Sequence, residues 1–200
     1  MTDTLSVVVA ILSRQWRFNM STRSNIIARC SDGLWRKIYC HWDGYLDHNG
    51  KVLFENYQDQ KKIDKLLKLG SISSLGPEIG KKHDFDWSTK LYEQHSSKKI
   101  TEEEYASAQK KGQEVCNVYH RDRGEPWEDT KPEAADTLAG VWTFEETLTE
   151  FSYVWDGRQW WVGDPDKGMQ AIIDLGEALA GKVSIHPNVK AFGIGVIGKW

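Results

Sequence analysis

The chain has 200 residues, of which 40% are hydrophobic and 28% are charged, and its formal net charge is −3. This composition is typical of a globular protein of about one domain and excludes disorder throughout the chain. Because both signs of charge are interspersed, the sequence predicts neither a bulk electrostatic nucleic-acid binder nor a DNA mimic.

The N-terminal segment, residues 1–19, is predicted to be either an extension upstream of the true start or an edge strand. Its apolar run at 5–12 is too short to span a bilayer, and no small-residue cleavage site follows it. We therefore expect no signal peptide and no membrane segment. Cys30, Cys40 and Cys116 fit no disulfide framework, which favours reduced thiols in a cytoplasm.

The hydrophobic pattern predicts an α+β fold, with a mostly antiparallel sheet of hairpins and helices packed on one face. The first half contributes, in chain order, a strand at 24–30, a turn at 31–33, a strand at 34–41, a short helix from about 47, a helix from about 59 to 70, and a polar insertion at 76–113. The helix after Asp59 is the clearest, because Ile63, Leu66 and Leu67 share one face. A capping box at Thr101 opens a helix inside the insertion.

The second half is predicted to contain, in chain order, a strand at 114–120, a short helix at 143–148, a hairpin of strands at 151–155 and 158–162, a helix at 169–179, and an extended tail at 183–200. Asp156-Gly157 between two aromatic-rich runs is typical of a two-residue type I′ turn, so the hairpin is the strongest β signal. Residues 20–182 are expected to form one domain.

Five strings of the sequence stand out: 20–27 (MSTRSNII), 38–45 (IYCHWDGY), 48–51 (HNGK), 69–76 (LGSISSLG) and 119–125 (YHRDRGE). Together they resemble a family of small, mostly uncharacterised proteins carried by tailed phages, prophages and other mobile elements. The resemblance covers roughly residues 20 to 165 with gaps, and its beginning at Met20 favours a start downstream of Met1. It implies an accessory protein in the cytoplasm of a bacterial host cell.

The string at 41–45 supplies four candidate binding residues at the end of a predicted strand: His41, Trp42, Asp43 and Tyr45. His41 with Asp43, or with Asp122, has the residue types of a general base and its orienting partner. The structural alternative is a turn built by the aspartate, two packed aromatic rings and one hydrogen bond from His41. No nucleophile or metal can be assigned beside them, so the structural interpretation is favoured and no catalytic residue is predicted.

The string at 120–125 supplies the densest polar cluster: His120, Arg121, Asp122, Arg123 and Glu125. Two arginines and a glycine at a strand end can bind a phosphate or carboxylate through paired N–H donors. In the alternative interpretation the loop is held by its own Arg–Asp and Arg–Glu pairs, which the alternating charges make easy. A small anionic ligand is one of these two hypotheses.

Four residues of these segments have zinc-ligand side chains: Cys40, His41, Cys116 and His120. At most three of them converge easily on one point of a sheet, so we predict no metal. The sequence has no convincing nucleotide-binding, hydrolase or zinc-protease motif, and no cofactor is expected. Cys40 beside His41 or His120 has the types of a nucleophile and its base, but a strand cysteine usually behaves as a small hydrophobic residue.

Ten tryptophans against six phenylalanines exceed ordinary usage. Most are expected in the core, and a surplus of Trp and Tyr can anchor an interface. The sequence therefore favours an accessory factor that binds a host or phage protein, and the resemblance implies host takeover or counter-defence. The alternative is a small-molecule, nucleotide or phosphate-binding protein, with or without hydrolysis, whose site joins 41–43 and 120–125 around one pocket. Between an enzyme and a protein without catalytic activity, the sequence favours the latter.

Overall fold

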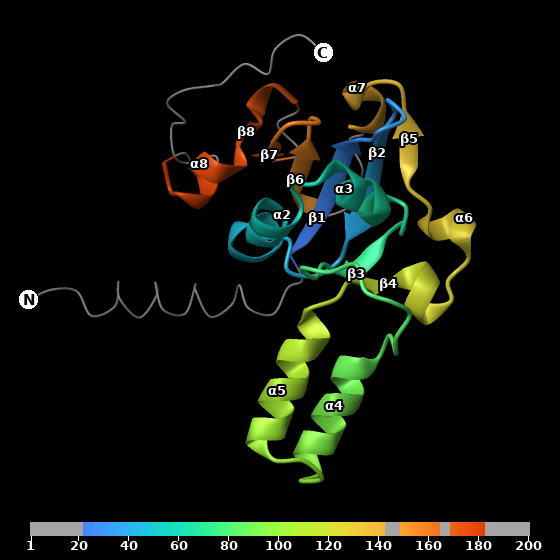
Figure 1. Ribbon diagram of the computed structural model, residues 1–200, viewed down its shortest axis with the longest axis vertical. Coiled ribbons are helices and arrows are strands. Elements are labelled where there is room, and N and C mark those ends of the chain that lie inside the picture. Colours follow the sequence, from blue (N-terminus) through green and yellow to red (C-terminus); the bar gives the residue numbers. More distant parts are fainter. Residues whose placement is uncertain (1–21, 143–148, 165–168, 183–200) are drawn as a thin grey trace, which may run out of the picture.

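A computed structural model describes residues 22–142, 149–164 and 169–182 of the chain. Within these ranges eight strands form one mixed sheet in the order β4-β3-β2-β1-β6-β7-β8, with β5 also paired to β2 (Figure 1). The strands are β1 (Arg23–Arg29), β2 (Trp35–Cys40), β3 (Ile72–Ser74), β4 (Asn117–Val118), β5 (Glu133–Ala135), β6 (Thr149–Trp155), β7 (Trp160–Gly163) and β8 (Ile173–Asp174). The helices are α2 (Lys51–Asn56), α3 (Gln60–Leu67), α4 (Trp87–Ser96), α5 (Glu102–Gln113), α6 (Trp127–Thr130), α7 (Leu138–Val141) and α8 (Leu175–Leu179), with π-helical turns η2 (Leu46–Gly50) and η3 (Tyr119–Arg123) and a 3-10 turn η5 (Met169–Ala171).

The central strand of the sheet is β1, which has two long partners. It is antiparallel to β2 and parallel to β6. β2 is also parallel to β3, whereas β2–β5, β3–β4, β6–β7 and β7–β8 are antiparallel pairs. The α+β class and the mostly antiparallel sheet are thus confirmed for the described residues. The parallel β1–β6 pair requires the long connection that separates these strands in sequence.

Hydrophobic residues cover both faces of the central strands. Ile26 and Ala28 of β1 belong to the larger core, which also contains buried residues of α2, α3 and α8. Ile27 belongs to a smaller core with Leu138 and Val141 of α7. Alternate residues of a strand point to opposite faces, so β1 is buried on both sides. The helices α2, α3 and α8 lie on one face as predicted, and α7 adds cover on the other.

The helix α3 matches its prediction. The carboxylate of Asp59 accepts the backbone N–H of Lys62 at 3.0 Å and so caps the helix N-terminus. Its buried face consists of Ile63, Leu66 and Leu67. After the last turn Gly70 adopts a φ of +74°, which few other residues tolerate. The short helix expected from about Asp47 begins as the π-helical turn η2 and continues as α2.

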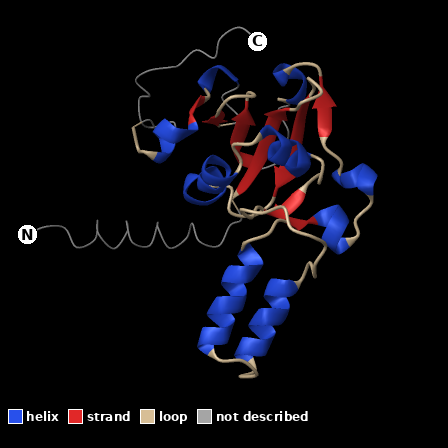
Figure 2. Cartoon of the chain, viewed as in Figure 1, coloured by secondary structure: helices blue, strands red, loops and turns tan. Residues whose placement is uncertain are grey.

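The polar insertion contains a helical arm, residues 87–113, formed by α4 and α5 and projecting away from the sheet (Figures 1 and 2). α5 begins with the predicted capping box, in which Thr101 accepts the N–H of Glu104 at 3.2 Å and the Glu104 carboxylate accepts the N–H of Thr101 at 2.8 Å. No residue of either helix is buried, and the rings of His95 and Tyr105 stack between the helices. The arm therefore contributes little to the main core.

The predicted strand at 114–120 is confirmed only at Asn117–Val118, which form β4. Glu114 caps the end of α5, Val115 forms an isolated bridge with Glu78, and η3 begins at Tyr119. The carboxylate of Asp122 accepts the N–H of Val118 at 2.7 Å, and this contact turns the chain back on itself. His120 consequently lies in a turn and not on a strand. Cys116 and His120 therefore do not lie on one face of a strand.

The aromatic-rich hairpin is confirmed as β6 and β7, but its connection differs from the prediction. The loop comprises residues 156–159, not a two-residue turn. The Asp156 carboxylate accepts the backbone N–H groups of Arg158 at 2.7 Å and of Gln159 at 2.9 Å. These side-chain bonds stabilise the wider loop in place of the tight turn.

The single helix predicted at 169–179 is wrong. Ile173 pairs with Val162 as part of β8, where a β-branched side chain packs well. α8 begins only after Asp174, whose carboxylate accepts the N–H of Glu177 at 2.9 Å. The predictions for 1–19, 143–148 and 183–200 fall on residues outside the described ranges.

Gly70 and Gly33 provide a matched test of backbone packing. Both have a positive φ, +74° and +86°, where alanine costs about 1–2 kcal/mol. A Cβ at Gly70 would also lie 2.3 Å from the carbonyl oxygen of Thr130, whereas nothing lies within 4 Å at Gly33. We expect Gly70→Ala to lower the free energy of unfolding by about 2 kcal/mol more than Gly33→Ala, measured by urea denaturation. Equal losses would contradict the close packing at Gly70.

Candidate functional site

Three of the strings that stand out in the sequence, 20–27, 38–45 and 69–76, meet at one end of the sheet, beside the string at 119–125. Ser24 of β1 pairs with Cys40 of β2, Cys40 pairs with Ile72 of β3, and Ile72 pairs with Val118 of β4. Four segments that are distant in sequence are therefore neighbours across adjacent strands. This convergence makes the end of β1–β4 the candidate functional region.

The two predicted binding segments, 41–45 and 120–125, lie on either side of β3. The backbone N–H groups of His41 and Trp42 donate to carbonyl groups of β3 at 3.1 and 2.9 Å, and Tyr119 N–H donates to Ser71 at 3.4 Å. The segments are thus brought near each other, with β3 between them.

The buried amide of Asn49 holds the segment from residue 41 to 50, which we call the motif loop. Its Nδ2 donates to Ser24 Oγ at 3.1 Å, to Cys40 Sγ at 3.2 Å and to the carbonyl oxygen of Trp42 at 3.2 Å. Its Oδ1 lies 3.1 Å from Nδ1 of His48. Asn49 is fully buried, so these contacts satisfy a side chain that has no access to water. They fix the loop to β1 and β2.

The turn of the motif loop is packed against the start of β1. The hydroxyl of Tyr153 donates to the carbonyl oxygen of Gly44 at 2.7 Å, and Gly44 N–H donates to Thr22 at 2.7 Å. A Cβ at Gly44 would lie 2.8 Å from backbone atoms of Thr22 and Arg23. Asp43 adopts a φ of +57°, which is uncommon for a residue other than glycine. The predicted turn role of the Asp43-Gly44 pair is what the geometry shows.

Two large aromatic side chains of this loop are exposed: Trp42, at 48%, and Tyr45, at 41%. We call them the aromatic surface. The Trp42 ring meets the His41 ring edge-on at 4.8 Å, and the Tyr45 ring lies 6.0 Å from that of His48. The aromatic surface is therefore carried by a backbone that buried contacts hold in one conformation.

The hydrogen-bond partner of His41 differs from both predicted partners. Its Nδ1 lies 2.8 Å from the hydroxyl oxygen of Tyr39 and does not bond Asp43 or Asp122. Burial lowers the pKa of His41, and the nearby Arg23 charge lowers it further. Burial raises the pKa of Tyr39. The predicted base and orienting carboxylate are therefore not assembled here.

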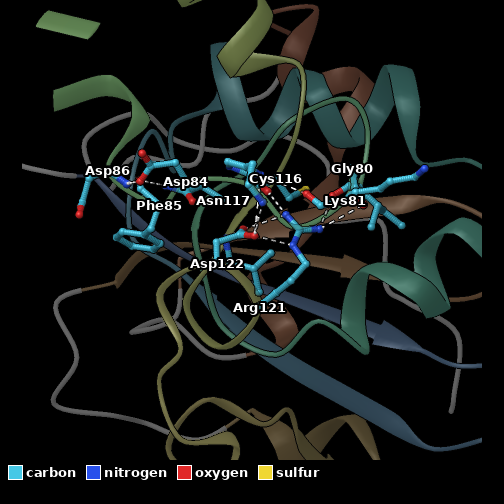
Figure 3. A network of polar contacts seen from close by, with 12 residues as sticks. Gly80, Lys81, Asp84, Phe85, Asp86, Cys116, Asn117, Arg121 and Asp122 are labelled. Atoms are coloured by element: carbon cyan, nitrogen blue, oxygen red, sulfur yellow. Dashed lines mark hydrogen bonds and ion pairs between the residues drawn. The ribbon is translucent and has the colours of Figure 1, made fainter. Parts of the chain in front are cut away.

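The guanidinium group of Arg121 is fully engaged within the protein (Figure 3). Its Nε and Nη2 donate to the two carboxylate oxygens of Asp122, each at 2.8 Å. Nη1 donates to the carbonyl oxygens of Ile79 at 2.7 Å and Gly80 at 3.2 Å, and Nη2 also donates to that of Cys116. These contacts account for all five N–H donors of an arginine.

The carboxylate of Asp122 is the buried centre of this network. Its side chain has no exposed surface, and it accepts the backbone N–H groups of Val118 at 2.7 Å and His83 at 3.1 Å in addition to Arg121. Burial raises the pKa of Asp122, but its hydrogen bonds to Arg121 and to the two N–H groups outweigh this and lower it overall. The ion pair thus joins the end of β4 to the segment that leads into the arm.

The other polar residues of the second segment also have partners inside the protein. Arg123, whose side chain is 57% exposed, pairs with Glu125 at 3.0 Å and lies 5.1 Å above the ring of Phe85. His120 Nδ1 lies 2.7 Å from the carbonyl oxygen of Glu125, and its ring meets that of Trp127 at 5.3 Å. The geometry matches the alternative in which the loop is held by its own pairs, and it offers no anion site at Arg121.

The cysteines and histidines of the region do not form a reactive or metal-binding group. Burial raises the pKa of Cys40 to about 12, and burial also raises that of Cys116. Both thiols are therefore protonated and inaccessible. Among the described residues no group of three or more His, Cys, Asp or Glu is placed to hold a metal ion. No helix within the described ranges has the length and apolar character that crossing a membrane requires.

Three residues of the region were absent from the sequence-based candidates: Arg23, Tyr39 and Asn49. Period-two alternation from His41 would have placed Tyr39 on its face, and the antiparallel hairpin would have placed Arg23 opposite. Asn49 was inside a string of the resemblance but had no chemical role assigned.

Comparisons with known protein families, curated proteins and solved structures found no match. The relation to phage and mobile-element proteins therefore stays a prediction.

Truncation of Arg121 should cost far more stability than truncation of Arg123. Arg121→Ala leaves the buried Asp122 carboxylate without its charged partner, and we expect a loss of about 3–5 kcal/mol in the free energy of unfolding. Arg123→Ala removes an exposed pair and should cost about 0–1 kcal/mol. Chemical denaturation measures both, and similar values for the two variants would refute the structural role of Arg121.

The same ion pair predicts a pH dependence of stability. The pKa of Asp122 is lower in the folded protein than in the unfolded chain, so its stabilisation is present above the unfolded pKa of about 4 and is lost as the pH falls through the folded value. The difference in unfolding free energy between the wild type and Arg121→Ala should thus shrink on acidification. A difference that stays constant from pH 7 to pH 3 would argue against this pair.

Proposed function

We propose that the protein is a binding protein, an accessory factor of a phage or mobile element that engages a host or phage protein in the bacterial cytoplasm. The observation that carries this proposal is the aromatic surface, because Trp42 and Tyr45 are exposed on a loop whose backbone is fixed by buried contacts. Host takeover or counter-defence is the biological role that the sequence resemblance implies.

Exposed Trp and Tyr side chains suit an interface for two reasons. They bury a large apolar area on contact and are the residues most often found as energetic hot spots. A loop that is already ordered also loses little conformational entropy on binding. The contacts of Asn49 and Tyr153 with the motif loop provide this order before any partner arrives.

The alternative function, a small-molecule or phosphate site joining 41–43 and 120–125, has less support. Arg121 donates all its N–H groups to protein acceptors, and Arg123 is paired with Glu125. Hydrolysis would need a nucleophile and a base in contact, whereas the Cys40 thiol is buried and His41 bonds a tyrosine. Binding through the aromatic surface is therefore the function that we propose.

Affinity capture with matched variants tests this function. The tagged protein, its Trp42→Ala and Tyr45→Ala variants and a Tyr92→Ala control are each recovered from phage-infected bacteria. Tyr92 lies on the arm and is 61% exposed, so it controls for the loss of an exposed aromatic side chain. We expect one protein at stoichiometric amount with the wild type and Tyr92→Ala and its loss with the two motif-loop variants.

The affinity for the captured protein then gives the magnitude. Removal of a hot-spot side chain costs about 2 kcal/mol or more of binding free energy, so we expect Trp42→Ala and Tyr45→Ala to weaken the Kd about 30-fold or more. Their melting midpoints should not change. A partner that binds the wild type and all three variants with equal affinity would refute the proposal.

A further inference from the structure

Three polar side chains gather on the sheet face opposite α2 and α3: Arg23 of β1, Tyr39 of β2, and His41 just beyond it. Ser24 pairs with Cys40 in the antiparallel register, and Arg23 and His41 each lie one residue beyond this pair, at the same end of the two strands. Cys40 belongs to the larger core, which places its neighbours Tyr39 and His41 on the other face. The three side chains come from two adjacent strands at the candidate end of the sheet.

A hydrogen bond with Tyr39 restrains the imidazole of His41. Its Nδ1 lies 2.8 Å from the hydroxyl oxygen of Tyr39, and the charge of Arg23 acts on both side chains, lowering the pKa of His41 and opposing the rise that burial causes in the pKa of Tyr39. A tyrosine hydroxyl has one proton to donate and Nδ1 of a neutral imidazole can accept it, so we assign Tyr39 as the donor. This assignment places the proton of the neutral imidazole on Nε2 and makes Nε2 a hydrogen-bond donor.

We propose that Arg23 and the Nε2–H of His41 bind a small oxyanion, a phosphate or a carboxylate group. Arginine supplies a permanent charge and paired N–H donors, which match the oxygens of such groups. Both protein groups present donors only, so the site favours an anion over a cation. It goes beyond partner docking, and it places anion binding at residues other than Arg121 and Arg123.

The surroundings of His41 and Arg23 favour an oxyanion as the ligand. Within the described residues the His41 ring bonds only Tyr39, and none of the ion pairs there involves Arg23. Burial, followed by the Arg23 charge, lowers the pKa of His41 from its usual 6.5, so the ring is neutral near pH 7. The edge-on contact with Trp42 at 4.8 Å restrains the ring orientation.

The test is an NMR titration of the purified full-length protein. Inorganic phosphate replaces chloride at constant pH and ionic strength while the imidazole resonances are followed. We expect a saturable shift of the His41 ring resonances and little change at His95, which pairs with Glu102 in the arm at 2.8 Å. A parallel titration with acetate shows whether the site prefers a phosphate or a carboxylate.

Variants connect the shift to the proposed residues. Arg23→Gln should weaken phosphate binding about tenfold or more, because a charged hydrogen bond is lost. Tyr39→Phe should also weaken it, because Nδ1 loses its donor and the imidazole proton is no longer confined to Nε2. Arg23→Lys keeps the charge without the paired donors and should fall between the wild type and Arg23→Gln. Melting midpoints establish that each variant is folded.

The outcomes separate this proposal from the proposed function. The absence of a saturable shift at His41 in the wild type, with phosphate and with acetate, would overturn the anion site whatever the variants do. Equal affinity in the wild type and Arg23→Gln would overturn it as well. Neither result bears on docking at Trp42 and Tyr45, which is tested by capture and needs no added anion.

Discussion

The buried side-chain amide of Asn49 connects the parts on which the candidate surface depends. It bonds Ser24 on β1, Cys40 at the end of β2 and the carbonyl group of Trp42 inside the motif loop. A buried amide is tolerated only when its polar atoms have partners, so the loss of one contact leaves a polar group unpaired in the core. The sheet end and the loop therefore form one unit, and exposed Trp42 and Tyr45 take their positions from contacts that are themselves buried.

On the other side of β3, the Arg121–Asp122 pair fixes the turn that follows β4. β4 has only two residues, and so few backbone hydrogen bonds cannot fix the turn that follows it. The helical arm is connected to the sheet through the segment just before β4. The guanidinium reaches the carbonyl groups of Ile79 and Gly80, where the chain leaves for the arm, and that of Cys116, where it has returned. The Arg121 side chain thus connects the two chain segments that lead into and out of the helical arm. Arginine is common in ligand-binding sites, but here it stabilises the fold.

The elements predicted correctly from sequence are those with local signals. The first hairpin has its turn residues and α3 has its cap at Asp59, so each could be recognised within a few positions. The strand at 114–120 failed because the contact of Asp122 with Val118 overrides local β propensity. The internal use of Arg121 depends on carbonyl groups about forty residues earlier, which no local pattern reveals. The contact of His41 with Tyr39 was missed because only carboxylates, Asp43 and Asp122, were considered as partners of the imidazole.

The aromatic surface and the proposed oxyanion site are adjacent, because the ring of His41 contacts the ring of Trp42. A ligand held by Arg23 and His41 would restrain the imidazole and, through that contact, the indole next to it. A partner seated on Trp42 would act on His41 in the reverse direction. Such coupling between two binding events is reciprocal by thermodynamic necessity, so an anion that strengthens partner binding is itself bound more tightly in the complex. The short distance between the rings makes a direct, contact-based coupling the simplest route, with no change of fold required.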